Sequence, residues 1–353
     1  GKVAPEEDRK FAYVWNSRTV LNAAKKVYLA VDGDEPGMAL GEELSRRIGR
    51  AKCWQVKWPD GCKDANDVLV KHGPEAIKAA LEAAEPWPVA GLFEAKHYTE
   101  KVSTLWEKGN AKGWSAGYDE VDEIYSVVPG QMTIVTGIPS SGKSEWIDQV
   151  MINLALKNDL KFAVCSFENP PEAHIVKLIE KKVGKPFFEG ATERMTQLER
   201  DAALAWINNH FSFIDTSDGE PSTIDSILDR ASSAVMRMGI RGLIIDPYNF
   251  IERDFKNSET DYISSMLTKV RNWARGNDAH VWFVAHPAKM MRTDGKVPVP
   301  GGYDISGSAA WFAKADFGMT VDRQKGPPEI HIWKCRFKWA GKMGSATLNY
   351  HAP

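Results

Sequence analysis

Eight consecutive residues match the phosphate-binding pattern GxxxxGK[ST]. They are Gly137, Ile138, Pro139, Ser140, Ser141, Gly142, Lys143 and Ser144. The glycines let backbone N–H groups turn toward a phosphate, the lysine reaches the β and γ oxygens, and the serine hydroxyl ligates Mg²⁺. A chance glycine-rich turn is the alternative, but the pattern follows a strand-like run, QMTIVT, and opens a helical run, SEWIDQVMINLAL. We therefore predict a site for Mg²⁺ and for ATP or another nucleoside or deoxynucleoside triphosphate.

Two acidic residues are candidates for the chemistry at this phosphate. Asp246 ends the apolar run GLIID, and we expect it to reach the Mg²⁺ shell from the strand adjacent to the phosphate-loop strand. Glu168 ends the run KFAVCSFE and is the candidate for the group that orients or deprotonates the attacking water. The alternatives are a common Asp-Pro turn for Asp246 and, for Glu168, a first-turn carboxylate that favours the following helix.

The elements that must position these residues alternate along the chain from Gly113 onward. Short apolar runs predict strands at 132–136, 162–167, 211–215, 242–246, 281–286, 317–321 and 330–336. Longer amphipathic periods predict helices at 143–157, 171–183, 192–209, 222–238 and 258–276. Such alternation predicts an α/β fold with a mostly parallel sheet and helices on both of its faces. Several predicted strands are apolar throughout, as burial on both faces requires.

The chain divides into three predicted parts. Residues 1–85 are expected to form a small α/β unit, with a strand from Lys26, a helix at 38–48, a strand at 53–58 and a closing helix at 74–84. Pro86 and Pro88 cannot continue a helix interior, so residues 86–112 are predicted to be a linker with an amphipathic helix at 92–108. Residues 113–353 form the large domain.

Composition places the chain among ordinary globular proteins. It has 353 residues, 43% of them hydrophobic and 26% charged, which is enough for one large domain and a small one. The formal charge is only −2, so nucleic acid would have to contact a local basic surface. The four cysteines match no zinc spacing, which favours a reducing cytoplasm. No apolar run approaches the ~18 residues of a membrane span, and the polar start is not a signal peptide, so we predict a soluble protein without a membrane partner.

The order of the motifs resembles a known family. The phosphate loop, SFE, LIIDPYNF, FVAHPAKM, SGSAAWFAKAD and IHIWKCRF follow one another as in the helicase domain of phage-type primase-helicases, Twinkle and, more distantly, DnaB. The resemblance covers residues 113–350. It implies a RecA-like P-loop core, a homo-hexameric ring with nucleotide sites between subunits, and NTP-driven movement along single-stranded DNA. It also implies forked DNA as substrate, a replisome polymerase as a partner, and the cytoplasm of a bacterium or of a phage-infected bacterium.

The same resemblance implies roles for the residues at the phosphate. Lys143, Ser144 and Asp246 would hold the phosphates and Mg²⁺, and Glu168 would be the catalytic base. His286, at the end of VWFVAH, is similar to the residue that senses the γ-phosphate and relays its loss to the DNA-binding loops. A lone histidine is otherwise more often structural.

Residues near the C-terminus match further contacts to the nucleotide. Arg336 in KCRF resembles the arginine finger offered to the neighbouring subunit, worth ~10³ to 10⁵ in rate, and Lys334 resembles a second cation on the same strand face. An exposed edge strand decorated with cations is the alternative. Arg323 and Tyr350 resemble the pair that sandwiches the nucleotide base. Ala313 departs from the glutamine that the family often has there, so the relay from γ-phosphate to DNA either does not pass through this segment or is shifted to Lys314 or another neighbouring residue.

A basic segment is predicted to contact DNA. Between Pro287 and Gly344 there are ten Lys and Arg against five Asp and Glu, a local charge of +5. Its first part, KMMRTDGK followed by VPVPGGYDISGS, is too rich in glycine and proline for regular structure, and in the family such loops grip the phosphates of one strand. The candidates are Lys289, Arg292, Lys296 and Lys314. Residues 253–261 are a second candidate loop, and solvated surface loops are the alternative.

Acids in the first part resemble the Toprim fold of primases and topoisomerases. Asp32 and Asp34 follow an apolar strand at DxD spacing, and Asp64 matches a third ligand of the Mg²⁺ site in that fold. Polar turns after each strand are the alternative. A complete Toprim domain also has a glutamate on an earlier strand, which no residue here matches, and a full primase has a zinc module. We therefore expect a partial Toprim domain with a vestigial metal site, and no primer synthesis by this chain.

Two other functions are compatible with the sequence. A recombination ATPase of the RecA or RadA type shares the core fold and forms filaments on single-stranded DNA, although the KCRF finger and the Toprim remnant argue against it. A nucleotide-dependent structural or loader protein with weak hydrolysis is suggested only by Ala313. The linker helix docks on the neighbouring subunit in the family, and surface packing within one subunit is the alternative.

Overall fold

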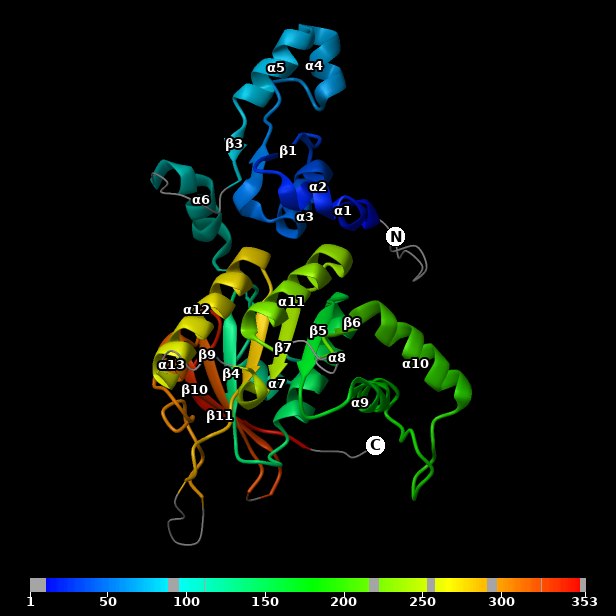
Figure 1. The fold of residues 1–353 in the computed structure, drawn as a ribbon, viewed down its shortest axis with the longest axis vertical. Helices are drawn as coiled ribbons and strands as arrows, with labels where there is room; N and C mark the ends of the chain where they lie inside the picture. The colour runs from blue at the N-terminus through cyan, green and yellow to red at the C-terminus, as the bar shows by residue number, and fades with distance from the viewer. Residues whose placement is uncertain are drawn as a thin grey trace. The chain divides into compact units, whose positions relative to one another are not determined.

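The computed structural model describes residues 11–87, 95–110, 112–215, 222–252, 258–290, 297–324 and 326–349 (Figure 1). The chain divides into two compact units. The first comprises Gly1–Gly109 with Val235–Gly239, and the second comprises Asn110–Ala234 with Ile240–Pro353. The division at residue 109 lies inside the predicted linker.

The first unit contains a three-stranded sheet in the order β1-β2-β3. β1 (Val27–Leu29) pairs parallel with β2 (Cys53–Gln55), which pairs antiparallel with β3 (Glu85–Pro86). The helices are α1 (Ala12–Asn16), α2 (Arg18–Ala23), α3 (Glu35–Ile48), α4 (Ala65–His72), α5 (Pro74–Glu82) and α6 (Thr99–Lys108). The predicted strands and the helices α3 and α5 are confirmed, whereas α1, α2 and α4 are short and were not predicted.

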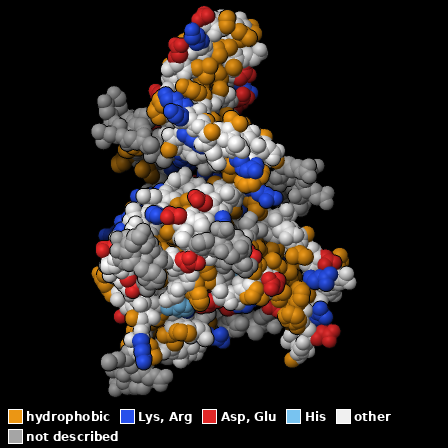
Figure 2. Space-filling view, in the orientation of Figure 1, with side chains coloured by type: hydrophobic (Ala, Val, Ile, Leu, Met, Phe, Trp, Pro, Cys, Tyr) orange, Lys and Arg blue, Asp and Glu red, His pale blue; other side chains and the backbone are white. Residues whose placement is uncertain are grey.

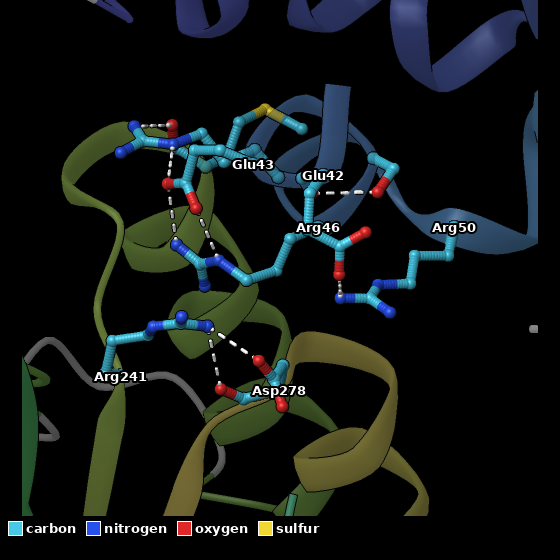
Figure 3. A network of polar contacts seen from close by, with 9 residues as sticks. Glu42, Glu43, Arg46, Arg50, Arg241 and Asp278 are labelled. Carbon is cyan, nitrogen blue, oxygen red and sulfur yellow. Dashed lines mark hydrogen bonds and ion pairs between the residues drawn. The ribbon is translucent and has the colours of Figure 1, made fainter. Parts of the chain in front are cut away.

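Two features of the first unit follow from its sequence, a largely buried group of ion pairs and an exposed apolar surface. Glu43 of α3 lies 3.0 Å from Arg46 and 2.6 Å from Arg47, as N–O distances (Figure 3). Burial alone would raise the pKa of Glu43, but the two cations lower it to about 2. Figure 2 shows apolar side chains gathered on the surface over α4 and α5, where Val70 is 77% exposed. Helix α6 likewise exposes apolar residues, with Trp106 90% exposed.

The second unit is built on an eight-stranded sheet in the order β11-β10-β9-β4-β8-β7-β5-β6. The six parallel strands are β4 (Met132–Thr136), β5 (Phe162–Ser166), β6 (Phe211–Phe213), β7 (Gly242–Asp246), β8 (His280–Val284) and β9 (Phe317–Asp322). β10 (Glu329–Cys335) is antiparallel to β9, and β11 (Gly344–Thr347) is antiparallel to β10. The predicted mostly parallel α/β sheet is confirmed; β11 was missed because its sequence, GSAT, has no apolar run.

Helices cover both faces of this sheet. They are α7 (Asp119–Asp122), α8 (Lys143–Asn158), α9 (Pro171–Val183), α10 (Gln197–His210), α11 (Ile224–Met238), α12 (Glu259–Asn277) and α13 (Ala310–Lys314). In Figure 1, α11 and α12 lie in front of the sheet. Val135 and Val284 pack in one apolar cluster with Met151 of α8, and the alternate residues of each strand point to the opposite face. β4, β7, β8 and β9 are buried along their whole length, as predicted.

Outside the core, an ion pair joins the residue before β7 to the residue after α12. Arg241 Nη1 lies 2.9 Å from Asp278 Oδ2, directly after α12 (Figure 3). None of the helices described here has the length and apolar character needed to cross a bilayer.

Candidate functional site

The phosphate loop joins the C-terminal end of β4 to the first turn of α8. At Gly137 an added Cβ would lie 2.4 Å from the carbonyl oxygen of Val321, so only glycine fits. Gly142 precedes α8 with φ +94°, in the left-handed region. Lys143 Nζ donates to two carbonyl oxygens of the loop, at 3.1 Å each. Within the described residues the buried hydroxyl of Ser141 has no hydrogen-bond partner, which leaves it for a phosphate oxygen.

Asp246 meets Ser144 at the C-terminal edge of the sheet. Ser144 Oγ donates to Asp246 Oδ2 at 2.5 Å. The expectation that the two strands are adjacent was wrong, because β8 lies between β4 and β7 and the loop brings the start of α8 across its end. Burial, helped by the charge of Glu168, raises the pKa of Asp246 to about 6. These hydroxyl and carboxylate oxygens are the hard donors that Mg²⁺ prefers, and a divalent cation would offset the crowded negative charge.

Glu168 and His286 follow different strands and meet beyond the same edge. His286 Nε2 lies 3.4 Å from Glu168 Oε1. Burial and the charge of Lys143 lower the pKa of His286, so its imidazole is neutral near pH 7. The Glu168 side chain is 44% exposed and therefore accessible to water. The candidate base and the candidate sensor are thus within reach of each other, and Lys143 interacts with the charge of Glu168.

A cavity of about 530 Å³ lies beside the phosphate loop. Gly142 of the loop is on its wall, together with Tyr118, Trp146 and Arg323. The rings of Tyr118 and Trp146 are 5.4 Å apart, so the wall offers flat apolar surface as well as a guanidinium. Arg323, the predicted base contact, therefore lies next to the loop, whereas Tyr350 is outside the described residues.

Arg336 lies at the end of the sheet where the parallel strands begin, and the phosphate loop lies at the end where they finish. Cys335 pairs with Phe317, the first residue of β9, because β10 runs antiparallel to it. Arg336 Nε is 3.0 Å from a carboxylate oxygen of Asp316, whose backbone N–H donates to Met132, the first residue of β4. The five residues of β4 separate this edge from the loop, a distance of about 17 Å at ~3.3 Å per residue. Arg336 therefore cannot complete the phosphate site of its own subunit.

Lys334 shares this edge with Arg336. Its Nζ donates to two carbonyl oxygens of α13 and lies 4.9 Å from the ring centre of Phe312. Burial and the charge of Arg336 lower the pKa of Lys334 to about 8. Arg271 is the third cation here, and Asp316 is the acid that opposes them. This excess of positive charge favours an incoming anion.

The candidate DNA contacts differ in their surroundings. Lys289 is exposed. Lys314 donates to two oxygens of α12, at 2.6 and 2.5 Å, and this geometry does not support its predicted contact with DNA. Arg292, Lys296 and residues 253–257 lie outside the described residues.

The segment that carries Lys289 begins at His286. Pro287 and Ile305 form an isolated antiparallel bridge, and Ser306 N donates to His286 O at 3.3 Å. The candidate sensor therefore lies where the two ends of the segment predicted to contact DNA are hydrogen-bonded to each other.

The carbonyl oxygen of Ala313 accepts hydrogen bonds from both Lys334 and Arg336. These contacts involve the backbone of Ala313 and not its side chain.

The predicted metal site of the first unit is not supported. Asp34 and Asp64 accept hydrogen bonds from the first turns of α3 and α4, at 2.9 and 2.8 Å. Lys63 Nζ lies 2.9 Å from Asp34 and 3.6 Å from Asp32, so an ammonium group is paired with both carboxylates. In the part of the chain that the structure describes, no group of three His, Cys, Asp or Glu is arranged to hold a metal.

Sequence reasoning missed Asp148 and Asp316, which are among the buried acids of the second unit. Asp148, one helical turn after Ser144, lies 2.9 Å from the Nε2 of His174 in α9, the helix that follows Glu168. Burial would lower the pKa of His174, but the charge of Asp148 raises it. The second acid is Asp316. The signals were the spacing of four residues on one helix for Asp148 and the final acid of SGSAAWFAKAD for Asp316.

Comparison with known proteins identifies relatives that match between a quarter and nearly all of this chain. The Twinkle homolog protein, chloroplastic/mitochondrial, of Arabidopsis thaliana is 43% identical over 371 residues, which cover 99% of this chain and 52% of that protein. The primase homolog protein of the same plant is 46% identical over 95 residues, 25% of this chain and 28% of that protein. The DNA helicase/primase of Enterobacteria phage T3 is 22% identical over 330 residues, 89% of this chain and 57% of the relative. The chain thus spans about half the length of the first of these relatives.

Solved structures share the fold over most of this chain. A solved ATPase domain aligns with a TM-score of 0.60 at 21% identity, covering 72% of this chain and 95% of that one. A DnaB-like replicative helicase, solved to study its interactions with primase, aligns with a TM-score of 0.62 at 19% identity, covering 81% of this chain and 71% of that one. The model of the DnaB-like helicase C-terminal domain matches residues 113–351, which include the phosphate loop, Asp246 and Arg336. On this evidence the chain belongs to the family of DnaB-like helicases.

Proposed function

We propose that this chain is the motor of a ring-forming replicative DNA helicase, which hydrolyses NTP between its subunits as it moves along single-stranded DNA. Family membership supports the class of enzyme. The contact between Ser144 and Asp246 supports a Mg²⁺–triphosphate site. Mg²⁺ bound there would neutralise negative charge on the phosphate oxygens during transfer.

The position of Arg336 is the observation that supports assembly into a ring. In one subunit, about 17 Å of strand separates it from the phosphate loop. A complete site therefore needs the phosphate loop of one subunit and Arg336 of the next. Such a head-to-tail contact gives a closed ring when the rotation between neighbouring subunits divides a full turn evenly. We expect a homo-hexamer, and Lys334 would bring a second positive charge to the same phosphate.

The other residues of the site have distinct tasks. Glu168 would orient and deprotonate the attacking water. His286, neutral and within reach of Glu168, would sense the γ-phosphate and pass its loss to the segment that begins there. The cavity walled by Tyr118, Trp146 and Arg323 would take the base of the nucleotide, with Tyr350 as the predicted second face.

DNA contacts and partners extend the proposal. Lys289 would bind phosphates of one strand together with Arg292 and Lys296, a mode that weakens steeply with salt. Forked DNA is the proposed substrate, and a replisome polymerase is the proposed partner.

The test mixes two inactive variants. Arg336→Ala removes the finger and Glu168→Ala removes the base, and each alone should lower the rate of hydrolysis by ~10³ or more. Subunits of the two kinds, mixed in equal amounts before assembly, form some interfaces that have an intact base on one side and an intact finger on the other. Random mixing makes about a quarter of the interfaces complete, so hydrolysis should return to that order.

Lys338→Ala is the matched control, because it removes an exposed cation two residues from Arg336 and should hydrolyse at the wild-type rate. Absence of any recovery in the mixture would refute a finger that acts between subunits. Light scattering with nucleotide and single strand gives the size of the assembly. Unwinding of a forked duplex, set beside a strand-exchange assay, separates the helicase from a filament-forming recombination ATPase.

A further inference from the structure

The carboxylate of Asp316 lies at the centre of the edge that carries Arg336. Asp316 is only 1% exposed. Oδ1 accepts a hydrogen bond from Arg271 Nη2 and is ion-paired with Arg336 Nε, both at 3.0 Å. Oδ2 accepts a hydrogen bond from the backbone N–H of Met132 at 3.2 Å. Donors from β4, from α12 and from the residue after β10 therefore fix this one side chain.

The guanidinium of Arg336 is held along one side. Its Nε faces Asp316, and its Nη2 donates to the carbonyl oxygens of Ala313 and Ala315, at 3.1 Å each. Among the described residues no hydrogen-bond partner exists for Nη1, and the side chain is 31% exposed. A planar guanidinium gripped in this way has its orientation set, with one terminal nitrogen left to meet an anion.

We propose that Asp316 is the positioning residue of the arginine finger, and that it fixes the finger to the strand that carries the subunit's own phosphate loop. This inference rests on the proposed role of Arg336 between subunits. Two observations support it. The carboxylate that pairs with Arg336 accepts a hydrogen bond from the backbone N–H of the first residue of β4. This strand is buried along its whole length and so gives the carboxylate a fixed support. The single negative charge of Asp316 faces the two positive charges of Arg271 and Arg336, so the net charge of this group remains positive and attracts a phosphate.

A purely structural role for Asp316 makes a different prediction. In that case the buried pair with Arg271 would be its purpose, and breaking that pair from either side would have the same effect. Asp316→Asn and Arg271→Ala both break this pair. Only Asp316→Asn also removes the charge that holds Arg336, so the two variants form a matched comparison.

The experiment compares these variants in the full chain under conditions of assembly. Asp316→Asn should lower kcat on the order of 10²-fold, the cost of a misplaced catalytic group, while KM and the affinity for a fluorescent nucleotide analogue change little. Arg271→Ala should lower kcat much less than Asp316→Asn does, because it leaves the pair between Asp316 and Arg336 in place. Mixing Asp316→Asn with Glu168→Ala subunits should restore hydrolysis, because the first supplies an intact loop and base and the second supplies a correctly held finger.

The outcomes are separable. Wild-type kcat in Asp316→Asn, with Arg336→Ala inactive, would overturn the positioning role and leave the proposed function standing. Full activity of Arg336→Ala would instead overturn the proposed function. Equal losses in Asp316→Asn and Arg271→Ala would assign a structural role and overturn the inference. If Asp316→Asn does not fold, Arg336→Lys decides: it keeps the charge but not the planar group, and near-wild-type hydrolysis would contradict the need for the grip.

Discussion

The buried histidine of β8 gives this protein a measurable pH dependence of stability. His280 Nδ1 donates to the carbonyl oxygen of Val128 at 2.8 Å, and its Nε2 lies 2.8 Å from Thr133 Oγ1 in β4. Complete burial lowers the pKa of His280 from 6.5 to about 4. Between these two pH values the unfolded chain binds a proton that the folded chain does not, so stability falls as the pH is lowered.

The magnitude follows from the size of the shift. Each unit of pKa corresponds to ~1.4 kcal/mol, so protonation of His280 should remove about 3 kcal/mol of unfolding free energy between pH 6.5 and 4, and about 2 kcal/mol of it by pH 5. Asp246 acts in the opposite direction, because its pKa is raised to about 6 and the folded state gains its proton first.

The assay is urea denaturation of the wild type and of His280→Gln at pH 7 and pH 5. Glutamine cannot titrate, whereas Asp246 is present in both proteins and cancels in the difference. The wild type should be the more stable at pH 7, and its advantage should shrink by about 2 kcal/mol at pH 5. An equal pH dependence in both proteins would refute the assignment of this effect to the buried imidazole.

Three further predictions concern the site and the core. Lys143→Ala should abolish triphosphate binding, measured by calorimetry, and retained tight binding would contradict the phosphate-loop assignment. Hydrolysis should decline at pH 8 or above as Lys334 loses its proton, and Lys334→Arg should flatten this decline in a pH–rate profile; an unchanged profile would remove Lys334 from the site. Gly318→Ala places a Cβ 2.0 Å from Trp333 and should lower the free energy of unfolding by ~1–3 kcal/mol, whereas Gly276→Ala, with nothing within 4 Å, should not; equal effects would refute the packing argument.

Local patterns determined much of this fold. The apolar runs GLIID and MTIVT give strands at the predicted residues, because a strand buried on both faces needs apolar side chains at every position. The glycines and the lysine of GIPSSGKS determine a phosphate loop for the same local reason: their backbone freedom and charge act within eight residues. Helix α9 likewise begins at Pro171, where the sequence predicts it, and ends before Gly184.

Only the tertiary structure decided which distant residues meet. Sequence spacing carries no information on strand order, so the insertion of β8 between β4, which precedes the phosphate loop, and β7, which ends at Asp246, was not foreseen. The pairing of Lys63 with Asp34 was not foreseen either, since side chains from separate loops come into contact only after folding. The placement of Arg336 at the far edge of the sheet, beside Asp316, follows from the reversal of β10, which no local pattern encodes.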